Sequence, residues 1–260
     1  MNTRTLKLVL EYDGTNFAGW QLQKKARTVQ GIIEEAVGKI LHHPARLVAA
    51  GRTDAGVHAT GQVANLMTTS SMGTERLKRA LNGVLPRDVT VVELDQVRDD
   101  FNARFDARSR TYRYTLSERR LSIGRSYAWH VPYKIDRNLL VESTVCLTGA
   151  CNLRGFSKGN DGDDYSTVIF NNHWIFDGAL SIFEITAVRF FHHAVRSIIG
   201  SAVKVARGRE TPDLLQRILE TRNRKIAGPT APAAGLCLIT VDYGDEDDGM
   251  HENLEVPNDV

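Results

Sequence analysis

Residues 49–66 read AAGRTDAGVHATGQVANL and hold a single carboxylate, that of Asp54. The runs RLVAA (46–50) and GQVANLM (61–67) predict two strands, because short apolar runs bounded by glycine-rich segments are typical of strands. Asp54 therefore lies in the connection between two strands. An aspartate in such a turn often accepts hydrogen bonds from neighbouring backbone N–H groups, which is its simplest role.

A nucleophile is the more specific hypothesis for Asp54. Arg52 lies two residues away, where its charge favours the ionised carboxylate, and Gly51 and Gly56 let a ligand approach the backbone closely. An ordinary aspartate is ionised at neutral pH, so it can attack an electrophile without a separate base. The residues around Asp54 leave both roles open.

The rest of the chain alternates between strand and helix patterns. Apolar residues at helical spacing predict a helix over 29–41, with Thr28 as its N-cap and Pro44 ending the pattern. Further helices are predicted at 74–84, near 136–148, at 195–206 before Gly208, and after Thr211-Pro212. Strands are predicted at 5–12, 89–94, 109–116, 166–176, 179–188 and 235–243, and a loop at 155–164.

This order of elements predicts an α+β fold. A central mixed, mostly antiparallel sheet would be built from two similar α/β halves, with helices packed on one side. We expect the first half, residues 1–105, to carry the Asp54 loop and the second, residues 106–243, to complete a shared sheet and cleft. Residues 244–260 are acidic and poor in apolar side chains, so we expect a disordered tail.

The composition is that of an ordinary globular protein, with 260 residues, of which 42% are hydrophobic and 25% charged. No apolar run is long enough to span a membrane, and no signal peptide is visible, so a cytoplasmic protein is expected. Cys146, Cys151 and Cys237 form no CxxC pair, which indicates buried free thiols. Phosphate-binding and dinucleotide glycine motifs are lacking, so we expect a reaction without cofactor or metal.

The charge is unevenly distributed. The formal net charge is +2, yet residues 244–260 hold seven acids and no lysine or arginine, and residues 108–137 hold eight basic residues and two acids. A basic body is typical of a protein with a polyanionic partner, although many basic proteins have none.

Five further residues are candidates for a site. Arg196 lies beside the apolar stripe of its predicted helix, and a partly buried arginine there would need a carboxylate or phosphate. Tyr112 alternates with arginines on its strand, as aromatic residues do in some single-strand nucleic-acid grooves, although core packing is its commoner role. For His58, His192 and His193, structural hydrogen bonding is favoured over acid–base catalysis.

Six motifs resemble the TruA family of tRNA pseudouridine synthases, in the family's order and from about residue 6 to residue 243. They are GRTDAGVHATGQV, EYDGTNFAGWQLQ, FNARFDA, RTYRY, FHHAVRSIIGS and PAAGLCLITVDY, of which the first is highly specific. The resemblance implies the pseudouridine synthase fold and isomerisation of uridine at tRNA positions 38, 39 and 40, in the anticodon stem-loop. It also implies a homodimer that holds tRNA across both subunits.

The resemblance assigns roles to five residues. Asp54 matches the nucleophile, and Arg52 an arginine that helps displace the target base and pairs with the aspartate. Arg196 matches the arginine that pairs with the catalytic carboxylate. Tyr112 matches a tyrosine that stacks on the uracil, and Leu236 an apolar residue against the base. The chain departs from the family pattern in the segment YSTVIFNN, which lacks an arginine, and at Ala194 and Ser197.

Two other functions are compatible with the residues alone. A non-catalytic RNA-binding module would use the same basic surface and would not need Asp54. An aspartate-nucleophile hydrolase of a small molecule would need Asp54 but is disfavoured by the absence of a metal or phosphate motif.

Overall fold

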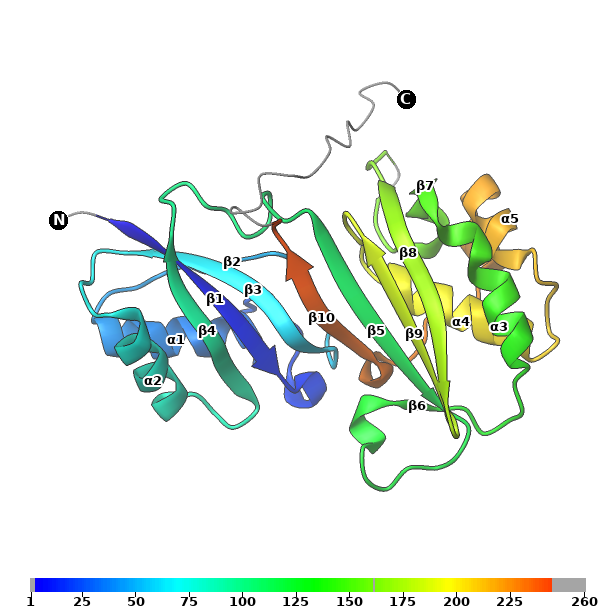
Figure 1. Ribbon diagram of the computed structural model, residues 1–260, viewed down its shortest axis with the longest axis horizontal. Helices are drawn as coiled ribbons and strands as arrows, with labels where there is room; N and C mark the ends of the chain where they lie inside the picture. The colour runs from blue at the N-terminus through cyan, green and yellow to red at the C-terminus, as the bar shows by residue number, and fades with distance from the viewer. Residues whose placement is uncertain (1–2, 161, 245–260) are drawn as a thin grey trace.

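One large sheet organises the residues that the computed structural model describes, 3–160 and 162–244 (Figure 1). Its ten strands are ordered β4-β1-β3-β10-β5-β9-β8-β7, with β2 added on β3 and β6 added on β5. The strands are β1 (Arg4–Tyr12), β2 (Val48–Ala49), β3 (His58–Thr68), β4 (Val89–Val97), β5 (Ser109–Ser117), β6 (Trp129–His130), β7 (Gly149–Asn152), β8 (Ser166–Asp177), β9 (Leu180–Ala187) and β10 (Leu236–Asp242).

Helices connect the strands within each part of the sheet. The α-helices are α1 (Val29–Leu41), α2 (Thr74–Val84), α3 (Arg137–Thr144), α4 (Ala194–Ala206) and α5 (Leu214–Thr221). Short 3-10 turns are η1 (Gly14–Asn16), η2 (Arg125–Tyr127), η3 (Val145–Leu147), η4 (Leu153–Phe156), η5 (Arg224–Ile226) and η6 (Ala233–Gly235).

The strand register shows that one face of the sheet is buried. Ala59 of β3 lies beside Leu238 of β10, Leu238 beside Tyr112 of β5, and Tyr112 beside Ile185 of β9, and all four are buried. In Figure 1, α1 and α4 pass behind the strands and cover this face. The neighbouring positions on β5 point the other way and include Arg113, which is exposed. The predicted arrangement, with helices on one side of the sheet, is confirmed.

The last strand joins the two parts of the sheet. The strands of the first 100 residues lie on one side of β10, and β5, β9, β8 and β7 lie on the other (Figure 1). β10 runs parallel to β3 and antiparallel to β5. Among the described strands, only the β3–β10 pair and the short β5–β6 pair are parallel, which confirms the mixed, mostly antiparallel sheet. Because β10 lies between β3 and β5, the loop before β3 comes close to the second part of the chain.

The element boundaries differ from the predictions in a few places. The Thr28 hydroxyl caps α1 as predicted by accepting a hydrogen bond from the Gly31 N–H at 3.3 Å, and the helix spans the predicted residues, Val29–Leu41. His42 ends it by adopting a left-handed conformation with φ of 57°. The helix expected near 136–148 is α3 followed by a 3-10 turn, and the loop expected at 155–164 begins inside η4. The short strands β6 and β7 carry too little sequence pattern to be predicted.

The composition-based expectations have mixed outcomes. The three cysteines are free, as predicted, but they are partly exposed rather than buried. Burial is still sufficient to raise the pKa of Cys151 and of Cys237 to about 11, so neither is a ready nucleophile. None of the described helices is long and apolar enough to cross a bilayer. Residues 245–260, and with them the expected disordered tail, lie outside the described residues.

Candidate active site

Asp54 lies in a tight turn between β2 and β3. The Val57 N–H donates to the Asp54 carbonyl oxygen at 3.1 Å, and Gly56 within this turn has φ of 78°, which glycine adopts without strain. The Asp54 side chain is 18% exposed, so it is mostly covered but still reachable from solvent.

Buried side chains support this loop from below. The Tyr12 hydroxyl lies 2.8 Å from the Thr53 Oγ1, and Gln62 donates from Nε2 to the Gly51 carbonyl oxygen at 2.7 Å. Gln62 Nε2 also lies within hydrogen-bond distance of the Tyr12 hydroxyl, at 3.4 Å, so side chains of β1 and β3 together fix the loop to the sheet. The sequence patterns identified neither residue as part of the site, since a tyrosine on an alternating strand is usually a core residue.

The segment after β1 packs directly on the same loop. The Trp20 N–H donates to the Thr53 carbonyl oxygen at 3.0 Å, and the Gly56 N–H donates to the Phe17 carbonyl oxygen at 3.2 Å. A Cβ atom at Gly14 would lie 2.0 Å from the Val57 carbonyl oxygen, so the close approach requires glycine there. The segment 13–20 therefore acts as a rigid support for the Asp54 turn.

Arg110 anchors the start of the loop. Its guanidinium is buried and donates to four carbonyl oxygens, among them that of Ala50 at 2.9 Å and that of Val188 at 2.6 Å. Burial lowers the pKa of Arg110, yet the carbonyl dipoles replace the missing carboxylate partner. One side chain thus ties the Asp54 loop to the segment that precedes α4.

Arg196 forms an ion pair with Asp54. Its Nη1 lies 2.9 Å from Asp54 Oδ2, and its Nε donates to the Ala231 carbonyl oxygen at 2.7 Å. The two side chains are 15% and 18% exposed, so the pair is partly shielded from water, which strengthens the attraction. Arg196 comes from the first turn of α4, and the two residues are 142 positions apart in the sequence.

Close packing of a loop on α4 positions Ala231 for this contact. A Cβ atom at Gly200 would lie 1.7 Å from the Pro229 carbonyl oxygen, and one at Gly228 would lie 2.4 Å from the Gly200 carbonyl oxygen. The Ala231 N–H also donates to the Arg196 carbonyl oxygen at 3.0 Å. Glycine at both positions is therefore required for the loop to reach Arg196.

We expect Gly200→Ala to destabilise the protein, because the new methyl group must displace the loop. Overpacking of this kind costs about 1–3 kcal/mol, and each kcal/mol lowers Tm by roughly 2–4 °C in a chain of this size. The matched control is Gly83→Ala in α2, where a Cβ meets nothing within 4 Å. That variant should gain about 0.5–1 kcal/mol, as alanine replaces glycine in a helix. Thermal unfolding that shows equal Tm values for the two variants would contradict this account of the packing.

Two histidines complete the surroundings of Asp54. His192 Nε2 lies 3.5 Å from Asp54 Oδ1, and His193 Nε2 lies 3.5 Å from Asp54 Oδ2. Burial, with repulsion from neighbouring cations, lowers the pKa of His193, and the Asp54 carboxylate only partly opposes this shift. His58 has a structural hydrogen bond, since its Nδ1 accepts from the Gly14 N–H at 3.1 Å. His192 and His193 instead face the carboxylate of Asp54.

Tyr112 and Leu236 lie on the buried face near the loop. Tyr112 is 8% exposed, and its ring packs edge-on against Phe190 with centroids 5.2 Å apart. A Cβ atom at Gly51 would lie 3.9 Å from the Tyr112 hydroxyl oxygen, which places this ring beside the start of the Asp54 turn. Leu236 is the buried first residue of β10 and pairs with Tyr114 of β5.

Arg52 occupies a different place from the other candidates. Its side chain is exposed, and among residues 3–160 and 162–244 no hydrogen bond or ion pair of this side chain is found. The cation beside Asp54 is that of Arg196, and Arg52 points toward solvent at the rim of the site.

The chain is similar to known proteins over most of its length. The family model described as tRNA pseudouridine synthase matches residues 8–106 and 145–244. The tRNA pseudouridine synthase A of Moorella thermoacetica is 39% identical over 243 residues, covering 92% of this chain and 99% of that protein. The chain belongs to the tRNA pseudouridine synthase family.

Other relatives agree with this assignment. The tRNA pseudouridine synthase A of Acetivibrio thermocellus is 38% identical over 92% of this chain and 100% of its own length, and that of Methylobacterium sp. is 39% identical over 91% and 96%. A solved Cbf5-Nop10-Gar1 complex matches 85% of this chain and 69% of its own at 11% identity, but its TM-score of 0.32 is too low to carry an argument. As a member of the tRNA pseudouridine synthase family, the chain is an isomerase.

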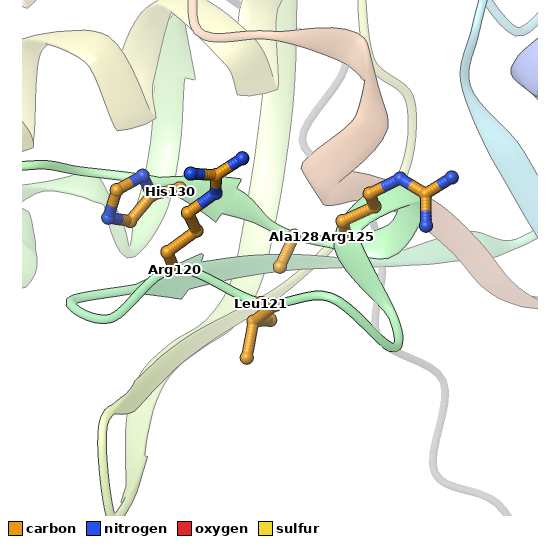
Figure 2. Close-up of a pocket in the computed structure, with 5 residues that line it drawn as sticks. All are labelled: Arg120, Leu121, Arg125, Ala128 and His130. Atoms are coloured by element: carbon orange, nitrogen blue, oxygen red, sulfur yellow. The ribbon is translucent and has the colours of Figure 1, made fainter.

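A separate cavity lies outside the Asp54 region of this tRNA pseudouridine synthase. It has a volume of about 220 Å³ and is lined by Arg120, Leu121, Arg125, Ala128 and His130, all from the segment between β5 and β6 and from β6 itself. Figure 2 shows Arg120 and Arg125 on either side of Ala128. Its basic lining suits an anion, although none of these residues contacts the Asp54–Arg196 pair.

Proposed function

We propose that the enzyme isomerises uridine to pseudouridine in the anticodon stem-loop of tRNA, at positions 38, 39 and 40, with Asp54 as the nucleophile. The observation that carries the proposal is the partly exposed ion pair between Asp54 and Arg196. The family membership supports the reaction type, and the geometry supports a carboxylate held in a tight turn beside a cation.

The required chemistry fits these residues. The glycosidic N1–C1′ bond of uridine must break, the base must turn, and a bond from uracil C5 to the same ribose carbon must form. C5 then loses its proton and N1 gains one, so the reaction is an isomerisation without exchange of electrons or phosphate. The Asp54 carboxylate supplies the attacking oxygen directly, and its contact with Arg196 orients it. Pairing with Arg196 engages Oδ2, so Oδ1 is the oxygen that remains for the attack.

The target base must leave the helix stack before it reaches Asp54, and extrusion costs a few kcal/mol. In the proposal, Tyr112 and Leu236 contact the extruded uracil from the floor of the site, and aromatic stacking returns about 1–3 kcal/mol. Burial raises the pKa of Tyr112, so its hydroxyl stays protonated at neutral pH. Tyr112 is therefore a contact surface for the base and does not serve as a general base in its resting form.

Arg52 and the basic segment 108–137 would act on the RNA rather than on Asp54. The exposed guanidinium of Arg52 at the rim is available to a phosphate or to the base as it leaves the stack. Arg120, Arg125 and His130 around the cavity of Figure 2 would contact the RNA backbone. The proposal includes a homodimer that holds tRNA across both subunits and a location in the cytoplasm.

The positions are tested with transcripts of one tRNA that carry uridine at 38, 39 or 40, followed by chemical mapping of pseudouridine. We expect conversion at these positions and none when cytidine replaces them. The internal control is every uridine of the same transcript outside the anticodon stem-loop, which should stay unmodified. Conversion only at such an outside position would refute the proposed site while leaving the reaction type intact.

A further inference from the structure

Three side chains that commonly bind metals converge at the Asp54 loop. The ligand atoms of Asp54, His192 and His193 all lie within 4.8 Å of one another. Each histidine Nε2 lies 3.5 Å from a different oxygen of Asp54. Ligands of a tetrahedral Zn²⁺ site, with bonds of about 2.0–2.1 Å, stand roughly 3.3 Å apart, so small side-chain movements would complete the set.

The backbone directs both histidines to one carboxylate. Side chains of adjacent residues normally diverge, but His193 has φ of 67°, a left-handed conformation that few residues other than glycine adopt. The two rings consequently lie with centroids 4.0 Å apart. Flanking hydrogen bonds hold this turn: the Lys158 N–H donates to the His192 carbonyl oxygen, and the Ala194 N–H to the Phe191 carbonyl oxygen, both at 2.9 Å. Such strain persists only where the surroundings fix it.

We infer that Asp54, His192 and His193 form a binding site for a borderline-soft divalent metal, of which Zn²⁺ is the representative. Two imidazoles and one carboxylate are a common ligand set for Zn²⁺ and related transition metals, whereas Mg²⁺ prefers oxygen ligands alone. The His192 side chain is 52% exposed, which gives a metal ion access from solvent.

Arg196 limits the strength of this site and determines its consequence. Its guanidinium already contacts Asp54 Oδ2 at 2.9 Å, so a metal ion would approach against a positive charge and would engage Oδ1 first. A carboxylate that coordinates a metal is no longer free to attack ribose or uracil. Metal binding therefore yields a reversibly inhibited enzyme. The binding itself is independent of the proposed function, and only the inhibition rests on it.

Binding is tested with the full chain free of any histidine tag, titrated with Co²⁺ as a spectroscopic substitute for Zn²⁺. We expect visible d–d absorption that saturates at one Co²⁺ per chain, is displaced by Zn²⁺ and is unaffected by Mg²⁺. His192→Ala and His193→Ala should each weaken the affinity at least about tenfold. The matched control is His173→Ala. The His173 side chain is 52% exposed, as that of His192 is, and its Nε2 lies 3.5 Å from a carboxylate oxygen of Glu184. Absence of the Co²⁺ signal, or its retention in both site variants, would overturn the inference.

Inhibition is tested in the pseudouridine assay with Zn²⁺ and then with a chelator. The unmodified chain and His173→Ala should lose activity in Zn²⁺ and regain it on chelation, and residual activity of His192→Ala should be less sensitive. Full activity with Zn²⁺ bound would overturn the inhibitory role. If no pseudouridine forms under any condition, the proposed function fails, while the Co²⁺ titration still decides whether the metal site exists.

Discussion

Asp54→Asn is expected to abolish pseudouridine formation while the chain still folds and binds tRNA. The amide has nearly the shape of the carboxylate but no negative charge, so it cannot attack an electrophile as a carboxylate does. Loss of a nucleophile lowers kcat by at least about four orders of magnitude. Single-turnover assays on an anticodon stem-loop substrate, with pseudouridine as the measured product, give the rate.

The fold of Asp54→Asn should survive with a modest loss of stability. The substitution leaves the partly buried guanidinium of Arg196 without its carboxylate, and an unpaired polar group of this kind costs about 1–3 kcal/mol. The matched control is Asp213→Asn, since Asp213 pairs with Arg217 at 3.0 Å and the two side chains are 52% and 42% exposed, where such pairs contribute little. Turnover by Asp54→Asn near that of the control would remove Asp54 from the mechanism.

Local signals explain how much of this fold was predictable from sequence. The Thr28 cap, the apolar stripe of α4 and the alternation on β5 each depend on neighbouring residues, and each predicted element is found. The glycines around Asp54 similarly indicated a tight turn. By contrast, β6 and β7 form because a neighbouring strand is available for pairing, which short segments do not encode by themselves.

The composition of the site depended on contacts that sequence spacing does not reveal. Arg52 is near Asp54 in sequence, yet its side chain points outward from the turn, while Arg196 reaches the carboxylate from 142 positions away. The residues alone indicated only that Arg196 needs an anionic partner, and the resemblance to the TruA family suggested which one. The positions of His192 and His193 follow from the left-handed backbone at His193, which no glycine signals in the sequence.

Arg196→Met is expected to lower kcat for pseudouridine formation by about two to three orders of magnitude with little change in the tRNA KM. The reason is that Arg196 contacts Asp54 and the Ala231 carbonyl oxygen, and its removal takes away the cation that orients the attacking carboxylate. Loss of one such electrostatic contact at a reaction centre typically costs about 3–4 kcal/mol. Kinetics with saturating and limiting tRNA separate the two parameters.

Arg196→Lys distinguishes charge from geometry at this position. Lysine keeps the charge, but its ammonium is a point charge that cannot contact Asp54 and Ala231 through the two ends of a planar fork. We therefore expect it to recover only part of the activity lost in Arg196→Met. The matched control is Arg217→Lys in α5, where the side chain is 42% exposed, and this variant should behave as the unmodified enzyme. A loss confined to tRNA affinity, with kcat intact in both Arg196 variants, would instead make Arg196 a phosphate contact. The Asp54–Arg196 pair would then be a feature of the free enzyme that substrate binding dissolves, and orientation of the carboxylate would have to come from His192 and His193.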